Sequence, residues 1–598
     1  MSDRPVFEQF TAVRSIHQAK WSPDGTRFAY LADTSGRMQL WMQAASGGPA
    51  IQLSALPARR VTGFSWSPDG SRIAFLADHL GDEMHQVFVT DVLENGGSWP
   101  RQLTDSPASQ FMLGGWTPDS FIVISGNDRE PSEVDIALLD PATGELERIV
   151  TGGRNYAGDA SPDGRWLTAT RLYSNSNSDV VLIDLATGGH EIITAHEGDV
   201  SNSPGPWDAD SGGFLMFTDQ DREFTAVVHY SVAGGSRSPL LEADMDVELA
   251  SQSRDGRWRA FVLNDQGRGS LRLVDLERDE TVTPELPGGV IEQVSLHPGL
   301  PRALVTMGSG REPTNIFELD FLSLDLERRE QALLGGLDPD LLAEPEAVSY
   351  PSFDRDIPAW LYRPEGAGPF PVLLSIHGGP EAQERPEYAY MGMYQYLVGQ
   401  GIAVLAPNIR GSTGYGKSYQ RLIQRDWGGG ELGDIDAAAK WLGQQDWVRS
   451  DRIGIFGASF GGFATLSAIS RLPDHWAVAA EAVGPVNLVT FAESVPPHWK
   501  PAMKHFVGDP EEDRELLVER SPLKYLDAVK TPLLVYQGAN DPRVVQAESD
   551  QLVAALREHG IDVTYHVDEE GGHGPANRDA AITWWRVISE FLVGHLNA

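Results

Sequence analysis

The chain has 598 residues, of which 85 are acidic and 47 are lysine or arginine, so its formal net charge is −38. This excess of negative charge excludes nucleic acid and anionic membrane surfaces as partners, because like charges repel. The chain contains no cysteine, which excludes disulfides and thiolate catalysis. Its hydrophobic fraction of 41% is sufficient for two domain cores.

The amino-terminal residues show no basic stretch followed by an apolar one, and the chain has no run of about eighteen apolar residues. We therefore expect a cytoplasmic protein that makes no membrane contact. The histidines show no paired spacing with acidic residues that resembles a ligand set, so we expect neither a metal nor another cofactor. The acidic surface either serves solubility or, beside a substrate channel, attracts cationic peptides.

A motif built around Pro-Asp-Gly recurs through the first half of the chain. Clear copies occupy residues 21–25, 66–70, 116–120 and 160–164, and weaker copies occupy 207–212, 253–256 and 296–299. Proline fixes φ in such a turn, glycine accepts a positive φ, and a β-rich run follows the turn. The copies recur about every 45 residues, which is the period of a four-stranded propeller blade. The sequence therefore predicts a seven-bladed β-propeller over residues 15–338.

After a glycine- and acid-rich stretch at 335–340, apolar strand patterns alternate with helical ones. The predicted strands are 372–376, 402–407, 452–456, 533–537 and 563–567, and the predicted helices include 436–442 and 547–559. Such alternation is typical of a parallel sheet covered by helices. We therefore predict a second domain over residues 339–598, with a doubly wound α/β sheet.

The segment Gly457-Ala458-Ser459-Phe460-Gly461 follows one of these strands and begins a helix of small residues. A serine with a glycine two residues to either side can occupy a sharp turn between strand and helix, since neither glycine carries a Cβ atom. This arrangement is the nucleophile elbow of an α/β-hydrolase. It makes Ser459 the candidate nucleophile.

The other members of a catalytic triad should follow as an aspartate and then a histidine, each on a loop after a strand. Asp541 lies in the polar turn after 533–537, and His573 lies between glycines after 563–567. The imidazole would take the serine proton, and the carboxylate would orient the imidazole. We therefore predict a triad of Ser459, Asp541 and His573.

Negative charge that develops on a substrate carbonyl needs preorganised N–H donors, each worth about 10²- to 10³-fold in rate. The backbone amide of Phe460, which follows the nucleophile, is the first predicted donor. The second is predicted in the Gly378-Gly379 segment, because paired glycines let a backbone approach the substrate closely. We expect His377 to support this segment.

Several motifs together resemble the prolyl oligopeptidase family of serine peptidases. In chain order they are His377-Gly378-Gly379-Pro380, residues 408–416, Asp426-Trp427-Gly428-Gly429, the elbow, Asp541-Pro542-Arg543-Val544 and Gly572-His573-Gly574. The first two are most similar to those of the acylaminoacyl-peptidase branch. The resemblance implies a propeller that caps the active site and admits short peptides, and a segment 1–14 that packs back onto the hydrolase domain.

The chain departs from the family pattern at two positions. Prolyl oligopeptidases and dipeptidyl peptidases carry a tyrosine at the position of His377 that serves as an oxyanion donor. Because this tyrosine is absent here, we expect the second oxyanion donor to be a backbone amide. The absence also argues against cleavage strictly specific for proline. Phe460 replaces a frequent tyrosine, which matters little because the backbone amide is the donor. Arg543 matches an arginine that holds a substrate carbonyl in the family, and the alternative is a structural ion pair.

We predict a serine peptidase of acylaminoacyl-peptidase or oligopeptidase type that cuts short peptides through an acyl-enzyme. Two alternatives stay open: a dipeptidyl aminopeptidase, which needs acidic residues to bind a free amine, and a carboxylesterase-like hydrolase with the same triad. Phe491, Val495 and Trp499 either line the specificity pocket or pack in the core. The sequence does not indicate the oligomeric state, and a homo-oligomer is possible because members of the family it resembles range from monomers to homo-oligomers.

Overall fold

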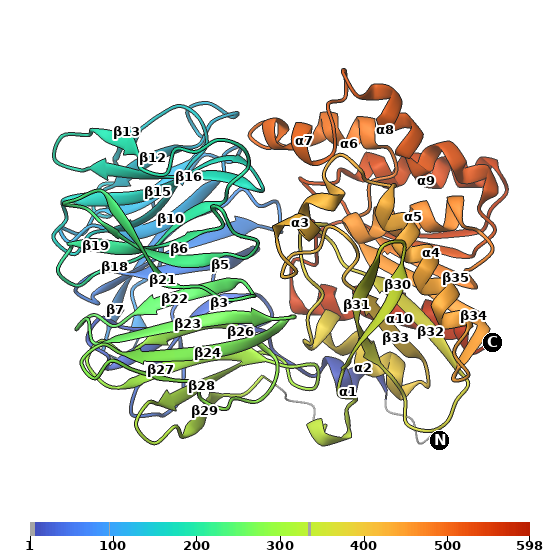
Figure 1. Cartoon of the computed structure of the whole chain (residues 1–598), viewed down its shortest axis with the longest axis horizontal. Helices are drawn as coiled ribbons and strands as arrows, with labels where there is room; N and C mark the ends of the chain where they lie inside the picture. The colour runs from blue at the N-terminus through green and yellow to red at the C-terminus, as the bar shows by residue number, and fades with distance from the viewer. Residues whose placement is uncertain (1–5, 95, 333–336) are drawn as a thin grey trace.

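The computed structural model describes residues 6–94, 96–332 and 337–598. These residues form a β-propeller and an α/β domain that lie side by side, with the propeller on the left of Figure 1. The first five residues of the predicted segment 1–14, and residues 333–336 near the predicted junction, lie outside the described part of the chain.

The described residues of the amino-terminal half form seven antiparallel sheets, six with four strands and one with five. The predicted seven-bladed propeller is therefore confirmed. Blade 1 consists of β1 (Ile16–Trp21), β2 (Arg27–Ala32), β3 (Gln39–Ala44) and β4 (Ile51–Gln52). Blade 2 consists of β5 (Arg59–Trp66), β6 (Arg72–His79), β7 (Gln86–Leu93), β8 (Gly96–Gly97) and β9 (Arg101–Gln102). Blade 3 consists of β10 (Phe111–Trp116), β11 (Ile122–Gly126), β12 (Asp135–Leu139) and β13 (Leu146–Val150).

The four later blades are built in the same way, with strands paired in sequence order. They consist of β14 (Asn155–Ala160), β15 (Trp166–Ser174), β16 (Asn177–Asp184), β17 (His190–Ile192); β18 (Asn202–Trp207), β19 (Gly213–Thr218), β20 (Ala226–Ser231), β21 (Ser236–Leu241); β22 (Val247–Gln252), β23 (Trp258–Asp265), β24 (Arg268–Asp275), β25 (Glu280–Val282); and β26 (Val290–Leu296), β27 (Arg302–Gly308), β28 (Asn315–Asp320), β29 (Leu326–Glu330).

Tryptophans in three copies of the recurring motif join neighbouring blades. The indole Nε1 of Trp66 donates to the Lys20 carbonyl oxygen at 3.3 Å, and that of Trp116 donates to the Ser65 carbonyl oxygen at 3.2 Å. Each acceptor lies on the first strand of the preceding blade. The repeat therefore fixes both the turn after that strand and the distance to the next blade.

The carboxyl-terminal domain contains an eight-stranded sheet in the order β30-β31-β33-β32-β34-β35-β36-β37, parallel from β33 onward. Together with the helices it confirms the predicted α/β-hydrolase fold. The strands are β30 (Glu346–Ser352), β31 (Arg355–Tyr362), β32 (Phe370–Ile376), β33 (Ala403–Pro407), β34 (Val448–Ala458), β35 (Val478–Ala482), β36 (Leu533–Gly538) and β37 (Val563–Asp568).

Helices cover both faces of this sheet. The helices are α2 (Ala389–Gly399), α3 (Lys417–Gln420), α4 (Gly430–Gly443), α5 (Phe460–Arg471), α6 (Leu488–Ser494), α7 (Lys500–Phe506), α8 (Arg514–Arg520), α9 (Gln546–Glu558) and α10 (Arg578–Leu596), with 3-10 turns at Pro339–Leu341, Arg421–Ile423 and Pro522–Ala528. Among the described residues no helix is both long and apolar enough to cross a bilayer.

Successive residues of β32 belong to different apolar clusters, as the period of two in a strand requires. Val372 and Leu374 pack in the cluster that includes α4, α5 and α9, whereas Leu373 packs with α2 and α10. The second cluster also contains Phe7 and Phe10 of helix α1 (Phe7–Thr11), whose rings lie 5.1 and 5.8 Å from that of Tyr396. The segment before blade 1 therefore docks on the hydrolase domain.

Four glutamates, Glu384, Glu431, Glu481 and Glu548, are buried in the hydrolase domain. Burial raises the pKa of Glu384 to about 8, that of Glu431 to about 7 and that of Glu481 to about 8. Glu481 lies on β35, where its Oε2 accepts from the Gly484 amide at 2.9 Å. Within the described structure its buried Oε1 has no hydrogen-bond partner. The neutral acid is therefore the form that the folded state favours.

We predict that Glu481→Gln stabilises the protein in a pH-dependent way. The raised pKa means that the folded state binds a proton that the unfolded state releases, so wild-type stability is fully present below about pH 4.5 and falls toward about pH 8. The variant lacks this loss and should gain about 1–4 kcal/mol over wild type at pH 8. Thermal melting between pH 5 and 8 measures it, with Glu147→Gln at an exposed site as control. Parallel profiles for all three proteins would contradict the prediction.

Candidate active site

Ser459 lies at the turn between β34 and α5 with φ of 59° and ψ of −121°, a strained conformation for a residue with a side chain. A Cβ atom at Gly457 would lie 2.2 Å from the Gly461 carbonyl oxygen, and one at Gly461 would lie 2.0 Å from the Ile376 carbonyl oxygen. Both glycines are therefore required sterically. The predicted elbow geometry is present.

The structure brings the three predicted triad residues together. His573 Nε2 lies 2.9 Å from Ser459 Oγ, and His573 Nδ1 lies 2.7 Å from Asp541 Oδ2. The Asp541 side chain is fully buried, and its Oδ1 accepts from the backbone amides of Arg543 at 2.8 Å and Val544 at 3.0 Å. These amides fix the carboxylate, which in turn orients the imidazole toward the serine.

The loop that carries His573 is held by close backbone contacts on two sides. A Cβ atom at Gly538, where β36 ends, would lie 2.0 Å from the Gly572 carbonyl oxygen. A Cβ atom at Gly572 would lie 2.0 Å from the carbonyl oxygen of Gly81 in propeller blade 2. The propeller therefore packs directly against the histidine loop.

The predicted oxyanion donors lie beside the nucleophile. Phe460 is the first residue of α5, where backbone amides have no partner within the helix. Gly379 lines the same cavity as Ser459 and Phe460, with φ of 116°. Gly378 packs against the elbow, since a Cβ atom there would lie 3.4 Å from Ser459 Cβ. Of the two predicted glycines, Gly379 is the one that faces the cavity.

His377 supports this segment through its ring. Its Nδ1 lies 2.7 Å from the Gly378 carbonyl oxygen, and its Nε2 lies 2.8 Å from Ser412 Oγ. Burial lowers the pKa of His377, which favours the neutral ring. The ring ties the glycine segment to the loop after β33.

A cavity of about 330 Å³ opens at Ser459 between the two domains. One part is apolar and includes Phe491 and Trp499, whereas Val495 is buried in the core and does not line the cavity. Two of the three pocket candidates from the sequence therefore reach the cavity. The apolar wall is completed by Leu172, Trp427, Phe460, Pro485, Ala502, Met503, Phe506 and Val544.

The polar wall of this cavity was not predicted from the sequence. The propeller contributes Arg154, Tyr156 and Asn175, and the residue after the His-Gly-Gly-Pro motif, Glu381, lies there as well. Of these residues, only Glu381 could have been proposed from the sequence, because it directly follows the His-Gly-Gly-Pro motif. The propeller residues belong to no motif, and their approach depends on how the domains dock.

Arg543 lines the cavity and also pairs with the propeller. Its Nε lies 2.9 Å from Glu83 Oε2, its Nη2 lies 2.9 Å from Glu83 Oε1, and the guanidinium lies over the Trp499 ring at 5.5 Å. About 43% of the Arg543 side chain remains exposed. The ion pair considered as an alternative is present, and the partly exposed side chain also lines the cavity.

The fold and a serine, histidine and aspartate within hydrogen-bond distance define a serine hydrolase of the α/β-hydrolase class. Residues 388–598 match the model of the prolyl oligopeptidase family, and residues 8–255 match that of the TolB beta propeller domain. The chain is 31% identical to dipeptidyl aminopeptidase BIII of Pseudoxanthomonas mexicana, over 96% of this chain and 85% of that protein. The chain belongs to the prolyl oligopeptidase family and is a serine-type peptidase.

Other relatives agree with this assignment. The acylamino-acid-releasing enzyme of Mus musculus is 27% identical over 35% of this chain and 30% of that protein. The solved structure of a Mycobacterium tuberculosis puromycin-hydrolyzing peptidase superimposes with a TM-score of 0.84 at 20% identity, covering 99% of this chain and 96% of the other. At that identity the structural likeness concerns the fold.

We predict that Gly461→Ala lowers kcat/KM about 10²-fold or more, because its Cβ would displace the elbow from the Ile376 carbonyl. Hydrolysis of a p-nitroanilide peptide measures the effect. Gly443→Ala, at the end of α4 with no atom near the added Cβ, is the matched control and should retain activity. Full activity of Gly461→Ala would contradict the steric account of the elbow.

Proposed function

We propose that Ser459 attacks the scissile carbonyl of a short peptide, that His573 accepts its proton and that Asp541 orients and stabilises the imidazolium. The serine oxygen bonds to the carbonyl carbon, His573 passes the proton to the peptide nitrogen, and the C–N bond breaks to release the amine and leave the acyl-enzyme. Water then hydrolyses the ester with His573 again as base. The 2.9 Å distance between His573 Nε2 and Ser459 Oγ carries this proposal.

We propose the amides of Phe460 and Gly379 as the two oxyanion donors. The elbow directs the Phe460 amide to the developing charge, and Gly379 lines the same cavity as the nucleophile. The apolar wall around Trp427 and Phe491 would take an apolar side chain on the acyl side of the scissile bond. The exposed part of Arg543 would hold a substrate backbone carbonyl.

The propeller restricts substrate size in this proposal. Arg154, Tyr156 and Asn175 of the propeller wall the cavity that contains Ser459, and Gly81 packs on the loop of His573. A folded protein could not bring a peptide bond to Ser459 between two such surfaces. A short peptide could enter and bind in extended form.

Two modes of cleavage fit the triad. Release of an acylated amino acid agrees with the His-Gly-Gly-Pro segment and with the relatives named for that activity, which match about a third of the chain. Dipeptidyl aminopeptidase activity agrees with the relative that matches 96% of the chain. Ester hydrolysis would use the same triad, and amide turnover distinguishes it. A cytoplasmic location and the lack of nucleic-acid partners stay predictions from the sequence.

We expect the wild-type protein to hydrolyse N-acetyl-alanyl or N-acetyl-leucyl p-nitroanilide or the matching free-amine substrates. Ser459→Ala should lower kcat/KM at least about 10³-fold, since loss of a triad member removes covalent catalysis. Circular dichroism of the variant controls for folding. Activity that survives in Ser459→Ala would overturn the assignment of the nucleophile.

We expect short synthetic peptides to be cut much faster than casein, and intact folded proteins to resist cleavage. The reason is that the propeller walls the cavity around Ser459. Mass spectrometry of timed digests measures the products. Rapid digestion of a folded protein by the wild type, and not by Ser459→Ala, would contradict the size restriction.

A further inference from the structure

The hairpin between β15 and β16 extends beyond the other strands of blade 4. In the described residues β14 pairs with β15 as far as Arg171, and β17 pairs with β16 only from Val181. The hairpin itself continues through residues 172–180, here called the overhang, where Leu172 pairs with Ser178. A two-stranded hairpin is at best marginally stable by itself in water. The position of the overhang therefore depends on the contacts that its side chains make.

The overhang forms part of the catalytic cavity wall. Leu172 and Asn175 line the cavity that contains Ser459, and Asn175 also lines a second interdomain cavity of about 640 Å³. Helix α7, which contributes Met503 and Phe506 to the apolar wall, packs against β15. A displacement of the overhang would therefore change the shape of the space that holds the substrate.

The loop between β17 and β18 takes the place of a neighbouring strand along the overhang. The Ser178 amide donates to the Val200 carbonyl oxygen at 2.9 Å, and the Val180 amide donates to Thr194 Oγ1 at 2.8 Å. His196 belongs to the same loop, and only 4% of its side chain is exposed. This loop therefore supplies hydrogen bonds that a fourth strand would otherwise make.

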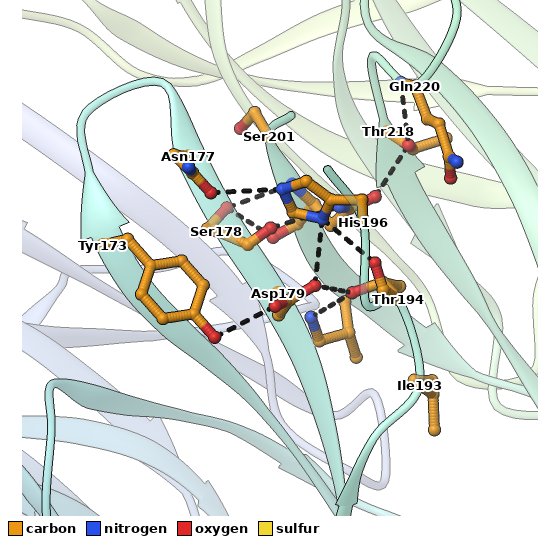
Figure 2. A network of polar contacts seen from close by, with 12 residues as sticks. Tyr173, Asn177, Ser178, Asp179, Ile193, Thr194, His196, Ser201, Thr218 and Gln220 are labelled. Carbon is orange, nitrogen blue, oxygen red and sulfur yellow. Dashed lines mark hydrogen bonds and ion pairs between the residues drawn. The ribbon is translucent and has the colours of Figure 1, made fainter. Parts of the chain in front are cut away.

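The His196 ring connects the loop to the end of the overhang, as Figure 2 shows. Its Nε2 lies 3.1 Å from Asn177 Oδ1, and its Nδ1 lies 3.1 Å from Asp179 Oδ1. Asn177 Oδ1 can only accept, so Nε2 is the donor in this contact. The Asn177 side-chain nitrogen donates to two oxygens of the loop at 3.3 Å, which directs Oδ1 toward the ring.

The two contacts of the ring are not equivalent. Asp179 also accepts from Thr194 Oγ1 at 2.7 Å and from Tyr173 Oη at 3.0 Å. Without His196, the Asp179 carboxylate would keep these two donors, whereas Asn177 Oδ1 would lose the donor that the described residues provide. The bond between His196 and Asn177 is therefore the one that the overhang cannot replace.

Both parts that the imidazole joins also contact the hydrolase domain. At the tip of the overhang, Ser176 Oγ accepts from Gln424 Nε2 at 3.0 Å. In the loop, the Asp199 carbonyl oxygen accepts from the Arg421 guanidinium. Gln424 lies three residues before Trp427, which belongs to the apolar wall of the catalytic cavity. The network in blade 4 thus supports the cavity wall from both domains.

We propose that His196 is a positioning residue that sets the shape of the catalytic cavity through its bond to Asn177. The bond holds the tip of the overhang in the arrangement that binds the peptide, and His196 does not touch the substrate. This inference rests on the proposed function, because the peptide must bind at Ser459. The bond affects binding more than chemistry, since the loop of His573 packs on blade 2.

The test separates the two contacts of the ring. His196→Gln keeps a nitrogen donor near the position of Nε2, within reach of Asn177, and His196→Asn keeps one near the position of Nδ1, within reach of Asp179. We expect His196→Asn to raise KM for a p-nitroanilide peptide about 3- to 10-fold, with kcat changed less than about 2-fold, and His196→Gln to stay near wild type. His190→Asn, at an exposed site on β17 of the same blade, is the matched control.

A rise in KM for His196→Asn that His196→Gln does not share would support the proposal. Unchanged KM values, equal rises in both variants, or a fall in kcat with unchanged KM would overturn it, and the last is what a merely structural role produces. Asn177→Ala removes the acceptor instead and should raise KM to the same extent. Because both changes break one bond, the double variant should show no further rise. Asn177→Ala alone decides the question if His196→Asn does not fold.

Hydrogen exchange of the segment 172–182, measured by mass spectrometry, tests the overhang without turnover. Exchange should be faster in His196→Asn than in wild type and in His196→Gln, because the overhang opens more often. A wild type that cleaves no p-nitroanilide peptide contradicts the proposed function. Unchanged exchange and unchanged KM in His196→Asn contradict this inference alone.

Discussion

The catalytic geometry depends on the close backbone contacts that hold the His573 loop. Gly538 at the sheet edge and Gly81 in the propeller approach Gly572 so closely that a Cβ atom on Gly538 or on Gly572 would collide with backbone. The imidazole then lies within hydrogen-bond distance of both Ser459 and Asp541. A hydrolase sheet alone would support one side of this loop, so the propeller is structurally part of the active site.

The same docking explains how charge is distributed around the cavity. Arg543 is neutralised by Glu83 across the domain interface, and Arg154 is tied to two carbonyl oxygens. Glu381 lines the same cavity, and its Oε1 accepts from Gln424 Nε2 at 3.0 Å. The docking of the two domains therefore gives both arginines of the cavity wall their partners.

Local sequence determined much of the architecture. The Pro-Asp-Gly turns and their spacing predicted seven blades, because the same tryptophan and turn contacts recur between neighbouring blades. The alternation of apolar strands with helices predicted the α/β-hydrolase sheet, although the short strand β35 was not foreseen. The elbow could be predicted from Gly457 and Gly461, because the atoms that exclude a side chain at these positions belong to the same turn and to the neighbouring strand β32.

The specificity side of the site could not be read in this way. The sequence itself determined the fold class and the candidate nucleophile, base and acid, since these follow from short motifs in a fixed order. Only the tertiary structure decided that Phe491 and Trp499 reach the cavity while Val495 does not, and that Glu83 pairs with Arg543. It alone brought Asn175 to Glu381, about two hundred residues away in the chain. The reason is physical: motifs encode local backbone geometry, whereas burial and charge pairing depend on which surfaces meet.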